Sequence, residues 1–300
     1  MFTQAQWDTL LTPIIYHHFG VGLNMVPSMR STLFNVQGST LAEEKGTGLG
    51  GMSVDAWNLY SKSGEKGSLK FDQLYTKTYT HVEYPVRVMI EKKLILNDQY
   101  RVINGAVQKV GVSAEQKMEI DAASILNNAF DSAYLGADGV ELCSGSHPAS
   151  PHASGTLLDN AGTDAITEKS VSETRVAMMR FKDDKGNEIG FMPDELWVPP
   201  ELEDKALKIV RSVQEPESGN NAANPQSGRW TVRPWLRLTG TKRWFMTSSV
   251  ARRMAVNWYN RETTTPMLVH EDTTALIYEF KLHYSYGFDD WRWVFGHNPS

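Results

Sequence analysis

The sequence contains one cysteine, Cys143, among 300 residues, so an intramolecular disulfide is excluded. Its amino end lacks the basic stretch followed by an apolar stretch that a secretory signal peptide would have. No apolar run approaches the roughly 18 residues that a membrane-spanning helix needs. These absences predict a protein of a reducing compartment that is neither exported by a signal peptide nor inserted in a membrane.

A marked excess of one charge is also missing. The chain has 30 basic and 35 acidic residues, a formal net charge of -5 and a pI near 5.9. This balance argues against a protein whose whole surface attracts nucleic acid or anionic lipid, so such contacts would have to be local. What the chain does have is length and apolar content: with 41% hydrophobic residues, it can bury one large or two small cores.

Complete cofactor and metal motifs are absent from the sequence. Gly46, Gly48 and Gly51 match G-x-G-x-x-G, but the preceding Thr-Leu-Ala-Glu-Glu-Lys at 40–45 is not the apolar strand that a dinucleotide fold needs. The histidine pairs His17 with His18 and His147 with His152 lack the further ligands that zinc requires. We therefore expect no cofactor-binding residue, no metal-binding residue and no cofactor.

One loop places potential catalytic residues close together in sequence. Cys143 lies four residues before His147, with Ser144 and Ser146 beside them. A nucleophile and its base are normally brought together by folding rather than by adjacency in a loop, so a half-buried cysteine beside a His-Pro turn is the stronger interpretation. We expect no catalytic residue and no enzyme activity, and keep a hydrolase that uses the loop 143–152 as an alternative.

Two segments alternate apolar and polar residues with the period of a β-strand. The first covers 76–91, where every second residue from 82 to 90 is Val, Tyr or Ile, and the second covers 276–288. Sixteen residues at about 3.3 Å each would reach roughly 50 Å, so part of the first strand should project from the body. Because the two segments are far apart in sequence, they predict a sheet formed by distant pairing in an α+β fold.

The first half of the chain also carries helix signals. Residues 1–35 show no sustained period and are expected to form an extended arm. Asn97 can cap a short helix that ends near Gly111, and Ser113 with Gln116 forms a capping box for a second, longer helix. This second helix is expected to pack on one side only, with the apolar stripe Met118, Ala122, Ile125, Leu126 and Ala129 opposite Glu115, Lys117, Glu119 and Asp121.

Three further elements are expected toward the carboxyl end. A helix over about 170–179 precedes a turn at 183–186, and Pro199 with Pro200 opens another helix. Alternation over 229–238 predicts a half-buried strand.

Charge is distributed unevenly in two blocks. Eight basic residues and no acid occur between 229 and 261, interleaved with aromatic residues, and eight acids against one lysine occur between 183 and 204. Such blocks can face nucleic acid, mate between identical subunits, or remain solvated faces that meet nothing. The basic candidates are Arg229, Arg233, Arg237, Lys242, Arg243, Arg252 and Arg253, and the acidic candidates are Asp183, Asp184, Asp194, Glu195, Glu201, Glu203 and Asp204.

An ordered series of short motifs carries a family resemblance. It includes Val-Glu-Tyr-Pro at 82–85, Glu-Lys-Lys-Leu-Ile at 91–95, Ile-Leu-Asn-Asn-Ala-Phe at 125–130, Ser-His-Pro at 146–148 and Pro-Asp-Glu-Leu-Trp-Val-Pro-Pro at 193–200. In this order the motifs resemble the major capsid proteins of tailed bacteriophages with the Hong Kong 97-type fold, and most closely the Mu-type major head subunit group.

The resemblance implies an α+β capsid fold in five parts. These are an N-terminal arm (1–37), an extended E-loop hairpin (38–80), a peripheral domain with a long spine helix (81–130), an axial domain (131–272), and a long strand that returns to the peripheral domain and leads to the C-terminal tail (273–300). The E-loop would lie across a neighbouring subunit, and the residues expected at that contact are Trp57, Tyr60, Lys62, Lys66, Lys70, Phe71 and Tyr75.

By the same resemblance, copies of the chain would assemble into hexamers and pentamers of an icosahedral shell around double-stranded DNA. Assembly would take place in the host bacterial cytoplasm, and the protein would end in the virion capsid. Expected partners are further copies of the chain, a portal, packaged DNA and a decoration protein. Many relatives begin with a cleaved helical segment, whereas here the arm begins almost at Met1, so either a separate scaffolding protein or a chain already in mature form is expected. An encapsulin-like cellular shell protein is the alternative of related fold.

Overall fold

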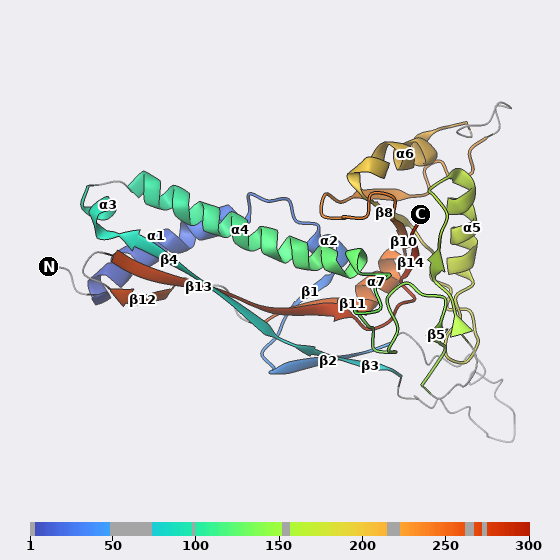
Figure 1. Cartoon of the computed structure of the whole chain (residues 1–300), viewed down its shortest axis with the longest axis horizontal. Helices are drawn as coiled ribbons and strands as arrows, with labels where there is room; N and C mark the ends of the chain where they lie inside the picture. Colours follow the sequence, from blue (N-terminus) through green and yellow to red (C-terminus); the bar gives the residue numbers. More distant parts are fainter. Residues whose placement is uncertain are drawn as a thin grey trace, which may run out of the picture.

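The computed structural model describes residues 4–48, 74–97, 100–151, 157–214, 223–261, 267–271 and 275–300. The molecule has an elongated half and a broader body (Figure 1). In the elongated half, two helices cover one face of a long sheet; in the body, shorter helices surround a second sheet (Figure 1). This mixture of helices with largely antiparallel sheets is the expected α+β class.

The long sheet contains β1 (Asn35–Gly38), β4 (Val82–Glu91), β11 (Val256–Asn260), β12 (Met267–Glu271) and β13 (Ala275–Phe288). β13 pairs antiparallel with β4, from Ala275 opposite Glu91 to Tyr284 opposite Val82. On its other edge β13 pairs with β12 and β11, and β1 pairs with β11 in parallel. The predicted pairing of two long, distant segments is confirmed, although His81 divides the first into β3 (Thr76–Thr80) and β4.

The helix α1 (Gln4–Leu23) corrects the expectation of an extended arm at the amino end. Leu11, Ile15 and Phe19 recur every four residues and are buried, which is the pattern of a helix face that packs on a core. The period is blurred in the sequence because bulky residues also lie on the exposed side of the helix, namely Leu10, Pro13, Ile14 and Tyr16.

The helix α4 (Tyr100–Asn127) is continuous where the sequence predicted two helices. Gly111, which was expected to end the first, lies where α4 meets α1, and a Cβ there would collide with the backbone of Phe19 and Leu23. Gly22 of α1 meets the backbone of Gln108 in the same way. The glycine at 111 therefore permits close helix approach and does not act as a stop signal, a distinction that depends on the partner helix.

α4 packs on two sides, which corrects the prediction of one packed side. Its apolar stripe is buried in the body core, but Glu115 and Glu119 on the other side are buried too. Glu119 accepts hydrogen bonds from the Ser28 hydroxyl, the Arg30 backbone N–H and the Trp235 indole N–H. Arg30, at the start of α2 (Arg30–Leu33), pairs with Glu115 at 3.2 Å. These bonds hold the segment that follows α1 against α4.

The sheet of the body has the strand order β7 (Ala161–Gly162), β14 (Val294–His297), β10 (Trp244–Thr247), β8 (Glu195–Val198) and β9 (Thr231–Pro234). The helices of the body are α5 (Glu168–Met179), α6 (Pro200–Arg211) and α7 (Ser249–Ala255) (Figure 1). The helices predicted near 170–179 and after Pro199 are confirmed. The strand predicted over 229–238 is shorter than expected, since only β9 pairs and Leu236 is exposed.

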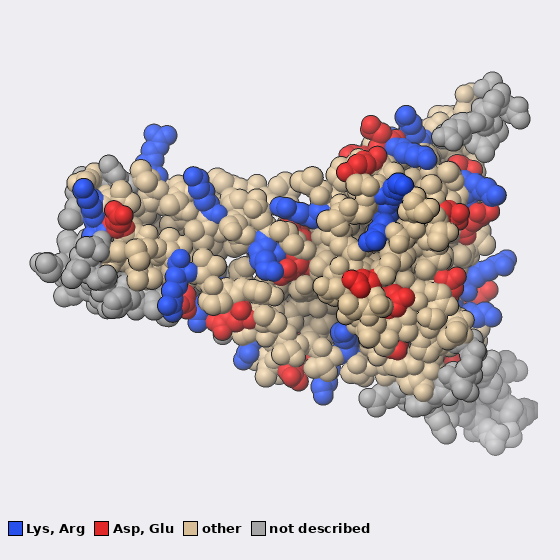
Figure 2. Space-filling view, viewed as in Figure 1, with Lys and Arg blue, Asp and Glu red and all other residues tan. Residues whose placement is uncertain are grey.

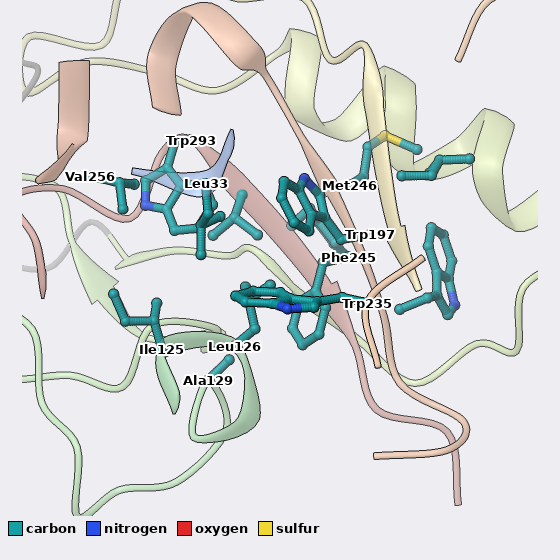
Figure 3. Close-up of a cluster of buried hydrophobic side chains, with 14 of the residues drawn as sticks. Leu33, Ile125, Leu126, Ala129, Trp197, Trp235, Phe245, Met246, Val256 and Trp293 are labelled. Atoms are coloured by element: carbon teal, nitrogen blue, oxygen red, sulfur yellow. The ribbon is translucent and has the colours of Figure 1, made fainter. Parts of the chain in front are cut away.

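One hydrophobic core connects the body with the end of α4. Figure 3 shows side chains of α2, α4, β8 and β10 gathered with Trp293, which precedes β14. Trp197 and Trp293 are fully buried in this cluster. Large aromatic side chains bury about 150–250 Å² each, so such residues account for much of the stabilisation of the body.

Three small features complete the described chain. α3 (Lys92–Leu96) connects β4 to α4, and β5 (His147–Pro148) pairs with β6 (Leu157–Leu158). β2 (Glu43–Thr47) and β3 form an antiparallel hairpin beside the body (Figure 1). Because β11 and β12 pair with β13, the long sheet crosses the predicted boundary between 272 and 273; the five-part division stays a prediction.

Candidate functional site

The predicted intersubunit loop is described only at its base. Trp57, Tyr60, Lys62, Lys66, Lys70 and Phe71 lie outside the described residues. Tyr75 is half-buried just before β3, and its backbone carbonyl accepts a hydrogen bond from the Gly48 N–H at 3.3 Å. In the sequence, residues 49–73 connect the two strands of this hairpin, β2 and β3.

The hairpin is joined to the body through one buried carboxylate. The Tyr79 hydroxyl of β3 donates a hydrogen bond to Asp289 Oδ1, and the Asn257 amide of β11 donates to Asp289 Oδ2 at 2.8 Å. Burial raises the pKa of Asp289 to about 6, and burial together with the nearby Asp289 charge raises the pKa of Tyr79 well above its usual range. No sequence motif signalled this contact, because Tyr79 and Asp289 are far apart in the chain.

Two arginines of the basic block meet one glutamate of the acidic block inside this chain. Arg252 is buried and donates to Glu195 at 3.1 Å, and Arg233 also pairs with Glu195, at 3.2 Å. Arg252 further donates to the backbone carbonyls of Thr32 and Leu33. The expectation that Arg252 and Glu195 face a neighbour or DNA is therefore corrected, because the two side chains form a buried ion pair between α7 and β8. The bonds of Arg252 to Thr32 and Leu33 connect this pair to α2.

Three other members of the blocks also serve local structure. Asp194 accepts from the backbone N–H of Ser249 at 2.7 Å, at the start of α7. Asp183 accepts from two backbone N–H groups of the turn that ends at Asn187. Arg243 donates to Asn127 and Asn298. The three side chains thus stabilise the start of a helix, a turn and the packing of the chain end.

The remaining candidates are more accessible. Arg229, Lys242, Arg253, Glu201 and Asp204 are exposed, and Asp184, Glu203 and Arg237 are half-buried. Lys242 contacts the Ser300 carbonyl at 2.8 Å. On the face in Figure 2, acidic and basic side chains are interspersed rather than gathered by sign. A role of the accessible arginines at DNA or at a neighbour stays a prediction.

The suspected catalytic loop is a buried hydrogen-bond network. His147 is fully buried, with Nδ1 at 2.7 Å from Asp138 Oδ2, Nε2 at 3.2 Å from Asn160 Oδ1, and its ring stacked on Trp291. Both ring nitrogens thus face oxygen atoms of residues other than a serine or cysteine. Cys143 is buried rather than half-buried, and burial raises the pKa of its thiol well above the usual range, which disfavours the reactive thiolate. This arrangement is structural.

The glycine motif has the wrong context for a phosphate site. Gly46 lies in β2 and Gly48 follows it, in an antiparallel hairpin rather than between a strand and a helix. Within the described ranges, histidine, cysteine, aspartate and glutamate side chains do not gather in a group of three that could hold a metal ion. Of the helices that the structure describes, none is long and apolar enough to cross a membrane.

Comparisons with known proteins agree with the fold. A family model described as phage capsid protein matches residues 75–295. The virus-like particle from Pyrococcus furiosus aligns with a TM-score of 0.58 at 8% identity, over 96% of this chain and 100% of that chain. The procapsid of bacteriophage JBD30 aligns with a TM-score of 0.57 at 17% identity, over 79% of this chain and 100% of that chain.

A phage-related protein from Bordetella bronchiseptica RB50 aligns with a TM-score of 0.51 at 12% identity, over 95% of each chain. At these identities the structural matches show the fold alone. A comparison with curated proteins finds no match.

Proposed function

The chain belongs to the phage capsid protein family and is a structural major capsid protein of a tailed phage, and we propose that copies of it assemble into hexamers and pentamers of an icosahedral shell around double-stranded DNA. The observation that supports this most is the family match over 75–295, which includes both long strands, α4 and the body. The shell places the protein in the virion capsid, and we propose that assembly takes place in the cytoplasm of the host bacterium.

We propose that residues 49–73 contact a neighbouring subunit. The segment carries large aromatic side chains among Ser, Gly and Lys, with too few apolar residues for a core of its own. Aromatic side chains dominate interface energetics when they find a partner. Because the segment and its receiving surface are different patches of one chain, the contact is heterologous and propagates around a ring or shell.

The partners follow from this assembly. Further copies of the chain are the principal partner, and packaged DNA would be met by non-specific contacts from accessible basic residues such as Arg229 and Arg253. The bacteriophage JBD30 capsid is described as decorated with minor capsid protein trimers, and a decoration protein is proposed here by analogy. A separate scaffolding protein, a portal and membership of the Mu-type group remain predictions from the resemblance.

The alternatives are less well supported. The family implies a structural, non-enzymatic role, and the loop 143–152 holds His147 in a network that lacks a nucleophile at either ring nitrogen. A cellular compartment shell is not favoured because the matching family is that of phage capsid proteins.

The test of the proposed contact deletes part of the segment and removes one of its aromatic side chains. A chain lacking 61–70 and carrying Trp57→Ala is expected to fold but not to form shells, because the deleted residues fall in the sequence between β2 and β3 and include no residue of either strand. Circular dichroism and thermal melting follow folding, and sedimentation with electron microscopy follows assembly. Trp57→Phe alone, which keeps an aromatic side chain, is the matched control and is expected to assemble.

Normal shells from the deleted chain would overturn the interface proposal, and loss of folding would show that the segment belongs to the core of its own subunit.

A further inference from the structure

The β2–β3 hairpin has very little buried surface of its own. Within β2 and β3, Gly46 and Tyr79 are buried, while the other positions are exposed or half-buried. A hairpin of two strands is only marginally stable in water unless it packs on something else. Its orientation on the body must therefore depend on a small number of contacts, among which those of the buried residues are central.

Tyr79 is fitted closely to the body. Its ring lies 5.4 Å from the ring of Tyr259, and a Cβ at Gly287 would come within 2.8 Å of it. Its hydroxyl donates to Asp289, a hydrogen bond to a charged acceptor. Bonds of this kind are directional and roughly twice as strong as bonds between neutral groups.

Asp289 is in turn held by the body and lies beneath the hairpin. Besides the bond from Asn257, its backbone N–H donates to the Ala255 carbonyl at 2.7 Å. A Cβ at Gly46 would collide with the Asp289 carboxylate, and one at Gly48 would lie 2.9 Å from Asp290 Oδ2. Both glycines therefore allow the backbone of the hairpin to lie directly over the two aspartates.

Other tethers are weaker. Lys77 Nζ donates to the Leu135 carbonyl at 3.1 Å, but this bond is exposed to solvent. His81, at the root of the hairpin, lies within hydrogen-bond distance of the hydroxyls of Ser39 and Ser285. The Ser39 hydroxyl donates to Glu44 Oε1 of β2 at 2.7 Å, but this bond is only partly buried and lies at the root of the hairpin. The Tyr79 contact is the one among these that is buried and has a charged acceptor.

We propose that Tyr79, Asp289 and Asn257 form a positioning joint that fixes the direction in which the β2–β3 hairpin leaves the body. A hairpin held mainly at one buried point can tilt about that point, and the tilt is largest at its far end, where Thr47 and Thr76 lie. The joint thus sets the position of the two strand ends that residues 49–73 connect in the sequence. The importance of the joint for shells rests on the proposed function, whereas its effect on hairpin direction does not.

The test measures the direction of the hairpin in the full-length, unassembled subunit. Spin labels are attached to Thr76→Cys at the far end of the hairpin and to Val102→Cys on α4, both exposed positions. Cys143 is buried, so it does not compete for the label. Pulsed electron paramagnetic resonance then gives the distribution of distances between the two labels.

Tyr79→Phe removes only the hydroxyl and is expected to broaden or shift this distribution. The matched control is Tyr284→Phe, because the Tyr284 hydroxyl donates to Asp121 at 2.6 Å, another buried bond to a carboxylate but remote from the hairpin. The control is expected to lower the melting temperature without changing the distance distribution. Asn257→Ala, which frees the other carboxylate oxygen, is a second variant that leaves Tyr79 in place and is expected to broaden the distribution too.

The outcomes separate the joint from the proposed interface. A distribution that stays unchanged in both Tyr79→Phe and Asn257→Ala, or that broadens equally in Tyr284→Phe, overturns the joint regardless of shell formation. A broader distribution with defective shells supports the joint and the interface together. A broader distribution with normal shells supports the joint as what sets the hairpin direction and overturns its importance for shells.

Discussion

The body and the β2–β3 hairpin are built in opposite ways. Every position of β8, β10 and β14 is buried, and the body encloses several large aromatic side chains. The hairpin has one buried aromatic side chain, Tyr79, over a buried aspartate. Stability is therefore concentrated in the body, whereas the direction of the hairpin depends on a few polar contacts. Regions of low local stability are where binding segments are usually found.

Each region also has its own buried carboxylate. Glu195 of the body is met by Arg233 and Arg252 and by the indole N–H of Trp197 at 3.3 Å. Asp289 under the hairpin is met by neutral donors, Tyr79 and Asn257. Loss of a partner lowers the free energy of unfolding most when the partner is charged and the remaining charge stays buried. The two regions should therefore respond differently to substitution.

The largest effect is expected in the body, from Arg252→Ala. Removing one partner of a buried ion pair typically costs about 3–5 kcal/mol, because the remaining charge stays buried without full compensation. The free energy of unfolding, measured by urea denaturation, should fall by this amount. Arg253→Ala is the control: Arg253 is exposed, and such substitutions usually stay within about 0.5 kcal/mol. Equal losses in both variants would contradict the role assigned to Arg252.

A medium effect is expected where α1 meets α4, in the elongated half of the molecule. Gly111→Ala places a methyl group against the backbone of Phe19 and Leu23 and should lower the free energy of unfolding by about 1–3 kcal/mol. Gly105 lies in the same helix with no atom within 4 Å of a new Cβ. Gly105→Ala should therefore stabilise the protein by about 0.5–1 kcal/mol, as alanine does in a helix interior.

Thermal and urea unfolding should show a lower stability of Gly111→Ala and a higher stability of Gly105→Ala than of the parent. If both substitutions destabilise the chain alike, the glycine at 111 is not a contact residue.

The smallest effect is expected on the pH dependence of stability, with opposite signs in the two regions. In the body, burial lowers the pKa of His297 to about 4, so its stabilising contribution is present above pH 6.5 and is lost as pH falls toward 4. Thr174, the backbone of Asp164 and the ring of Trp244 surround it. Its neutral form is therefore the one that the fold accommodates.

Under the hairpin the sign is reversed. Because the pKa of Asp289 is raised from 3.8 to about 6, the folded state binds a proton that the unfolded state does not, and stability from this group rises as pH falls through that window. Tyr79, Asn257 and Asp290 face its carboxylate. Between pH 4 and 7, the melting temperature should fall more steeply with decreasing pH in Asp289→Asn than in the parent, and less steeply in His297→Gln. Identical slopes in all three proteins would contradict both assignments.

Much of the fold could be predicted from the sequence where local period and packing agree. The alternation over 82–90 and 276–288 predicted two long strands, and they pair with each other because both carry the period of a half-buried sheet. The apolar stripe of α4 was predicted for the same reason. α1 was missed because residues of similar hydrophobicity lie on its buried and exposed sides, which removes the periodic signal.

The candidate site was less accessible to sequence reasoning. The charge blocks were visible, but composition does not tell whether Arg252 faces solvent or Glu195, since both placements use the same residues. His147 falls within the Ser-His-Pro motif, yet that motif does not indicate Asp138, Asn160 or Trp291, which complete its network. The contact from Tyr79 to Asp289 joins positions 210 apart in the chain, and nothing local signals it.

Short-range patterns in the sequence were sufficient for the two long strands, the apolar stripe of α4 and the family resemblance. Which charges are buried, why Gly111 is a glycine and how the hairpin is attached to the body follow only from the tertiary structure. These features depend on what lies opposite a residue in space, and a partner far away in the chain leaves no period or spacing that could be recognised.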